Sequence, residues 1–66
     1  MNEWLKTLKQ AVHDTFDYGA DAQAIMSRRR TVPSPEQLEV LAARLAGAIL
    51  CATLALALLE EEGVSV

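Results

Sequence analysis

His13 and Asp17 are the side chains whose types and spacing come closest to a catalytic or metal-binding arrangement in this 66-residue sequence. Four residues apart on a helix, an imidazole nitrogen and a carboxylate oxygen lie on the same face and can share one metal ion. The sequence contains no cluster of cysteine and histidine at zinc spacing. The preferred interpretation is a solvated histidine on a polar helix face, so we expect no metal and no cofactor.

Nucleophilic and phosphate chemistry find little support in the remaining residues. No glycine-rich phosphate loop is present, and Ser27 and Ser34 have no nearby base in a concave site. Cys51 is the single cysteine and lies in an apolar run, which predicts a small buried hydrophobic side chain in a reducing compartment. A disulfide between two copies across a symmetry axis is the alternative. We expect a protein that is not an enzyme.

Charged and aromatic residues offer candidate contacts to a partner. The aspartates at 14, 17 and 21 line one side of a helix, as a solvated face or as a docking surface for a basic partner. The three arginines at 28 to 30 form either a charge cluster at a helix C-terminus or a phosphate contact. Aromatic residues left partly exposed would be anchors for a partner. The candidate partner-binding residues are Trp4, Asp14, Asp17, Tyr18, Asp21, Arg28, Arg29 and Arg30.

Size and charge narrow the class of protein. A chain of 66 residues forms one small domain, residues 1–66, whose single core is marginal without oligomerisation or another staple. The net charge of −3 argues against a dedicated nucleic-acid binder. Met1–Trp4 begins an amphipathic pattern and not the apolar region of a secretory signal, so we expect a cytoplasmic location.

The second half of the chain predicts a helix from about 35 to 62. Ser34 is a good N-cap, Pro35 suits the first helical position, and the side chain of Gln37 can reach back to the cap. Gly63 can adopt the left-handed conformation that ends the helix, with Val64 folded back onto Leu59.

The first half predicts a helix from about 2 to 30, because apolar residues recur at three heptad positions. Gly19 either breaks this helix or allows the opposite helix to approach closely, and the pattern that resumes in phase at Ala22 favours the second interpretation. Two helices of similar length joined by a turn at 31–34 predict an antiparallel hairpin.

Residues 45 to 59 are uncharged and apolar on every side of a helix, so one neighbouring helix cannot cover them. Seven residues of this helix can face the first one: Leu38, Leu41, Leu45, Ala48, Ala52, Ala55 and Leu59. The remaining apolar surface predicts an all-α homodimer in which two hairpins form a four-helix bundle. The predicted dimer interface consists of Val40, Gly47, Leu50, Cys51, Leu54 and Leu58.

A membrane span is the alternative use of the same run. Fifteen uncharged residues fall between the length of a core helix and that of a spanning helix, and the flanks are basic on one side and acidic on the other. The high alanine content, the well-formed helix caps and the lack of Trp or Tyr beside the run argue for a soluble protein.

In length, hairpin pattern and absence of catalytic machinery, the chain resembles the small helical-hairpin dimers encoded by plasmids and phages. The resemblance runs along the whole chain, from Leu5 through the cap at 34–37 to Gly63. One such group comprises plasmid copy-number regulators that bind paired RNA loops, and another comprises anti-activators and inhibitors that bind host regulators such as quorum-sensing receptors. The resemblance implies a small regulator and assigns no individual site.

We therefore expect a cytoplasmic homodimer that binds another protein, such as a transcription regulator, as an inhibitor, anti-activator or adaptor. It would act by occluding a surface that this partner needs. The alternatives are an RNA-binding four-helix bundle, which a basic exposed face would favour, and a small membrane-inserted protein of the holin type.

Overall fold

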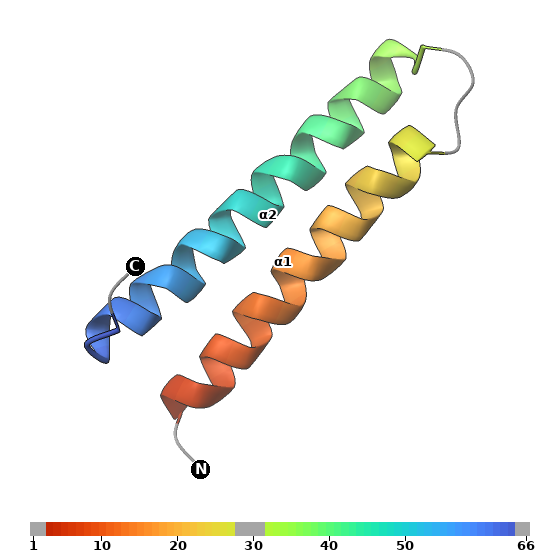
Figure 1. The fold of residues 1–66 in the computed structure, drawn as a ribbon. Coiled ribbons are helices and arrows are strands. Elements are labelled where there is room, and N and C mark those ends of the chain that lie inside the picture. Colours follow the sequence, from red (N-terminus) through yellow and green to blue (C-terminus); the bar gives the residue numbers. More distant parts are fainter. Residues whose placement is uncertain (1–2, 28–31, 65–66) are drawn as a thin grey trace.

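The computed structural model describes residues 3–27 and 32–64. Helix α1 spans Glu3–Ser27 and helix α2 spans Pro35–Glu61. Figure 1 shows the two helices side by side and antiparallel, with the start of α1 and the end of α2 at the same end of the molecule. The predicted all-α helical hairpin is thereby confirmed for the described part of the chain.

The start of α2 has the predicted capping box. The backbone N–H of Gln37 donates to Ser34 Oγ at 3.3 Å, and the backbone N–H of Ser34 donates to Gln37 Oε1 at 2.9 Å. Pro35 occupies the first helical position, where its missing N–H has no intrahelical acceptor to lose. Local sequence alone therefore determines where this helix begins.

The end of α2 is closed by Gly63, as predicted. Its φ of 85° lies in the left-handed region that favours glycine. Two backbone hydrogen bonds close the turn, from Gly63 N–H to Glu60 O at 2.9 Å and from Val64 N–H to Leu59 O at 3.0 Å. These are the two bonds of a Schellman motif, and they satisfy carbonyl groups that the helix leaves free.

Helix α1 runs through Gly19 without a break, which confirms the favoured prediction of one continuous helix. The reason predicted for this glycine is wrong, however. A Cβ atom built on Gly19 would meet no atom within 4 Å, so this glycine is not where the helices come close. The close approach is at Gly47 of α2, where a Cβ atom would lie 2.9 Å from the ring of Tyr18.

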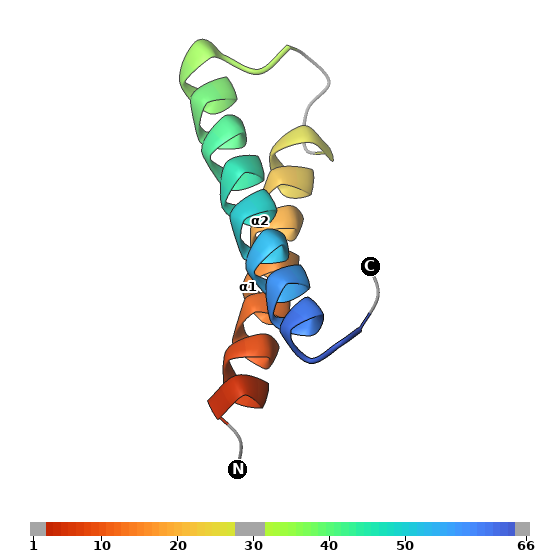
Figure 2. The same ribbon diagram turned by 90° about the vertical axis from the view of Figure 1, so that its left-hand side faces the viewer.

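Three contacts fix the register of the hairpin along its length. At one end Trp4 Nε1 donates to Leu58 O at 3.0 Å. Near the middle the ring of Tyr18 lies against Gly47, and one turn further Asp21 Oδ2 lies 3.9 Å from Arg44 Nε. A quarter turn from Figure 1, Figure 2 shows α2 passing in front of α1 at an angle.

The most deeply buried residues of the seam between the helices have small side chains. Within 3–27 and 32–64, the buried residues are Ala11, Ala22 and Ala55. Leu38 and Leu45 were predicted to face α1 but are exposed. The reason is steric: alanine and glycine let the helix axes approach, so the contact stripe centres on them and these leucines fall outside it.

The hairpin exposes more surface than a compact protein of its size. Its accessible surface is 5092 Å², whereas a compact monomer of 7.2 kDa is expected to expose about 4,100 Å². Helix α2 is also long and apolar enough to cross a membrane by length and composition, and it is barely covered by α1. Both observations describe a large apolar surface on α2 that α1 leaves exposed.

Candidate functional site

The hairpin has two broad faces of opposite character, one on each side of the seam. Residues two apart on a helix point in nearly opposite directions, so Phe16 and Tyr18 lie on different faces. The Tyr18 face comprises Asp14, Asp17, Tyr18 and Asp21 of α1 with Val40, Leu50 and Leu54 of α2, which share the Gly47 side of that helix. The Phe16 face comprises Val12, Phe16 and Met26 of α1 with Leu38, Leu45, Ile49 and Leu56 of α2.

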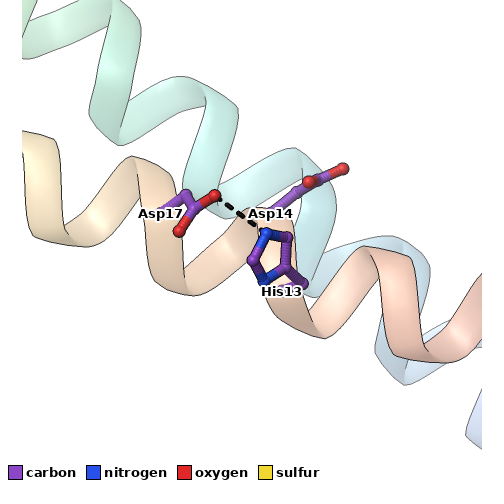
Figure 3. Close-up of side chains that lie close together, drawn as sticks. All are labelled: His13, Asp14 and Asp17. Carbon is purple, nitrogen blue, oxygen red and sulfur yellow. Dashed lines mark ion pairs between the residues drawn. The ribbon is translucent and has the colours of Figure 1, made fainter.

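The three aspartates of the Tyr18 face form an acidic row along α1. Figure 3 shows the Asp17 carboxylate pointing toward the His13 ring, and the two atoms lie 3.1 Å apart. Asp14 Oδ1 accepts a hydrogen bond from Gln10 Nε2 at 2.8 Å, and Asp21 pairs with Arg44. Asp17 and Asp21 each keep 60% of their side-chain surface exposed. Their charges remain available to a partner.

The group formed by His13, Asp14 and Asp17 has its ligand atoms within 4.8 Å of one another. Two of the three residues are exposed, and each already has a polar neighbour: His13 and Asp17 pair with each other, and Asp14 accepts from Gln10. This arrangement is typical of a solvated polar helix face, and the expectation of no metal stays a prediction.

The two aromatic residues predicted as partner anchors are part of the hairpin itself. Trp4 is half-buried, and its indole N–H is used by the backbone carbonyl of Leu58. Tyr18 is also half-buried, with one side of its ring over Gly47 and the Arg44 guanidinium 5.9 Å from the ring centroid. Each of the two residues therefore keeps only part of its surface for a partner.

The predicted dimer-interface residues share one side of α2 but differ in exposure. Val40, Leu50 and Leu54 are exposed on α2, whereas Cys51 and Leu58 are half-buried. Gly47 was predicted to point away from the first helix, and this orientation is wrong because the residue faces Tyr18. A glycine at that position is needed inside the hairpin, where the ring leaves no room for a side chain. Arg28, Arg29 and Arg30 lie outside the described residues.

Phe16 is the residue of interest that sequence reasoning missed. It is not among the predicted partner-binding or interface residues, but it is 75% exposed, more than any other aromatic residue described. It lines an open groove of about 410 Å³ together with Val12, Thr15, Ala52, Ala55 and Leu56. The spacing of the small residues at 11, 15 and 22 marks the seam of α1 and could have shown that Phe16 lies beside it.

Comparison with known proteins finds no relative of this chain. No protein-family model matches it, and neither the curated proteins nor the solved structures contain a match. No known protein therefore assigns a role to the two faces of the hairpin or to the groove beside Phe16.

Proposed function

We propose that the chain is a non-enzymatic protein-binding module that works as a homodimer, with two hairpins packed as a four-helix bundle in the cytoplasm. The observation that carries this proposal is that α1 leaves most of the apolar surface of α2 uncovered. This helix is apolar on all sides, and α1 covers only one of them. In water the remaining sides need protein around them.

The accessible surface in excess of that of a compact monomer is about the area that contact with a second copy would bury. The hairpin exposes about 1,000 Å² more than a compact monomer of its mass would, and each partner of a standard protein interface buries about 800 Å². The interior of the single hairpin supports the same inference. The three alanines buried within residues 3–27 and 32–64 are a small core for a stable domain, because the hydrophobic stabilisation of folding scales with the apolar area removed from water.

The Tyr18 face suits another protein. Its acidic row on α1 runs beside exposed leucines on α2, and Leu50 keeps 71% of its surface exposed. Acidic side chains along an apolar strip complement a surface that is basic and apolar, such as an amphipathic basic helix. Occupying such a surface on a regulatory protein would block its other contacts, which is the mode of action of an inhibitor or anti-activator.

Affinity purification from the native host tests this proposal with two matched variants. The wild-type protein is expected to retain one protein partner in stoichiometric amount. Asp17→Lys should reduce the retained partner at least about tenfold, because it reverses a charge at the centre of the acidic row. Glu60→Lys makes the same change in charge at the end of α2 and should retain the partner. Recovery of RNA or lipid alone with the wild-type protein contradicts the proposal.

A membrane-inserted hairpin of the holin type is the second candidate, and the length and apolar composition of α2 favour it. In this case α2 would enter the bilayer, with the acidic row of α1 outside. Fractionation of cells separates the two candidates. A soluble protein is expected in the supernatant without detergent, whereas a spanning protein remains in the membrane after alkaline extraction. An RNA-binding role has less support, since the described basic residues are Lys6, Lys9 and Arg44, and Arg44 pairs with Asp21.

A further inference from the structure

The Phe16 face has a protruding side chain directly beside a hollow. Phe16 keeps 75% of its surface exposed, although it lies near the middle of α1. Beside it, the groove of about 410 Å³ has a floor of small residues, Thr15, Ala52 and Ala55. Ala55 is one of the three buried residues described. The hydroxyl of Thr15 donates a hydrogen bond to Ala11 O at 2.8 Å. The floor therefore offers no unpaired polar side-chain group.

A protrusion beside a hollow is the shape that a twofold interface requires. In such an interface the same patch occurs on both subunits, so a side chain that protrudes from one copy must meet a hollow on the other. On this face both elements come from one chain and lie next to each other. A twofold axis between them places each Phe16 in the groove of the other copy.

From this geometry we propose that the Phe16 face is the surface through which two copies associate, and that the partner's Phe16 fills the groove floored by Ala52 and Ala55. This inference rests on the proposed homodimer and assigns its interface. It replaces the interface predicted from the sequence, which consisted of Val40, Gly47, Leu50, Cys51, Leu54 and Leu58.

The size of the face agrees with a stable dimer. The hairpin measures 45 × 21 × 16 Å, so its broad side projects about 900 Å², against about 800 Å² that each partner buries in a standard interface. The face also carries large apolar side chains over much of its length, from Leu38 and Met26 at one end to Leu56 and Val12 toward the other, with Ile49 66% exposed near the middle.

Charge favours the same choice of face. The residues that line the groove are uncharged. The Tyr18 face, by contrast, carries three carboxylates, and a twofold axis through it would bring two acidic rows toward each other. Like charges in close apposition oppose association. Self-association through the Phe16 face leaves the acidic row free for a different partner.

Two variants that remove similar amounts of exposed apolar surface test the assignment. Phe16→Ala is expected to weaken dimerisation by roughly 30-fold or more, the loss typical of a central aromatic anchor. Leu50→Ala on the Tyr18 face should change it by less than about threefold. The measurement is sedimentation equilibrium over a range of concentrations, with circular dichroism to establish that both variants remain helical. Equal weakening by the two variants, or a greater effect of Leu50→Ala, contradicts the assignment.

A second measurement uses the unmodified sequence and does not depend on a variant folding. In a dimer prepared from one isotope-labelled and one unlabelled copy, filtered nuclear Overhauser spectra report contacts between copies only. Contacts from the Phe16 ring to the methyl groups of Ala52 and Ala55 are expected. A dimer without these contacts overturns the assignment and leaves the proposed homodimer standing. A folded monomer, or a protein dispersed only in detergent micelles, overturns both.

Discussion

At the scale of single residues, the two glycines that lie within the helices have opposite effects on packing. Gly19 has free space where a side chain would be, whereas Gly47 lies under the ring of Tyr18. Both are in helices, where glycine costs about 1 kcal/mol relative to alanine. At Gly19 this cost has no compensating contact in the hairpin, and at Gly47 it is offset by the close packing of the two helices.

Gly19→Ala is therefore expected to raise the free energy of unfolding by about 0.5–1 kcal/mol. Gly47→Ala is expected to lower it by about 1 kcal/mol, because the new Cβ would lie 2.9 Å from the Tyr18 ring and overpacking outweighs the gain in helix propensity. Urea titrations followed by circular dichroism at one protein concentration measure both. A gain of stability in Gly47→Ala equal to that of Gly19→Ala would show that the ring moves away freely.

The indole of Trp4 serves a backbone carbonyl that the end of α2 leaves free. Glu62 N–H donates to Leu59 O at 3.1 Å, so Leu58 O takes the hydrogen bond from Trp4 Nε1 instead. Trp4→Phe removes this donor and should destabilise the protein by about 1 kcal/mol. Tyr18→Phe is the control, since no hydrogen bond of its hydroxyl is found within the described residues, and it should cost less than about 0.5 kcal/mol. Similar losses in both variants would mean that aromatic packing, and not this hydrogen bond, is what matters.

At the scale of the elements, α2 is defined by its ends and not by an amphipathic pattern. The capping box at Ser34 and the Schellman motif at Gly63 satisfy backbone groups at the two ends. Between them the helix is apolar nearly all round, so its rotation about its own axis is not determined by its own sequence. That rotation is set by contact with α1.

Ser34→Ala removes the side-chain acceptor for Gln37 N–H and should destabilise α2 by about 1 kcal/mol. Ser34→Asp keeps an acceptor at the N-cap and should retain most of the wild-type stability. Thermal unfolding monitored by circular dichroism compares the three proteins at equal concentration. Unchanged stability in Ser34→Ala would indicate that the packing of α2, and not its cap, sustains the first turn.

At the scale of the whole molecule, the small core predicts that folding and association are coupled. Because three alanines are the buried residues of the described hairpin, the proposed homodimer would bury most of its stabilising apolar area between copies. The stability of such a protein depends on its concentration.

Roughly 100-fold dilution should remove about 2.7 kcal/mol of stability per dimer and lower the melting temperature. The check is a series of thermal melts at increasing concentration, with Phe16→Ala melting lower than the wild type throughout the series. A melting temperature that does not change with concentration would identify a hairpin that is stable alone, and the homodimer would have to be abandoned.

The sequence by itself determined the two helices, the start and end of α2, the antiparallel hairpin and the shortage of cover for α2. These follow from local rules, because caps, turns and uninterrupted apolar runs can be recognised within a few residues of where they act. The acidic row at 14, 17 and 21 was also identified from spacing alone, since residues three and four apart share a side of any helix.

Only the tertiary structure decided which face each side chain occupies. A helix that is apolar on every side gives no periodic signal for the side that meets its neighbour, so Gly47 was predicted to point outward and Leu38 and Leu45 inward. The packing is set by where small residues of both helices let the backbones approach. With Gly47 under Tyr18 and alanines along the seam, Phe16 and Leu50 are left exposed on opposite faces, which is the arrangement that both proposals depend on.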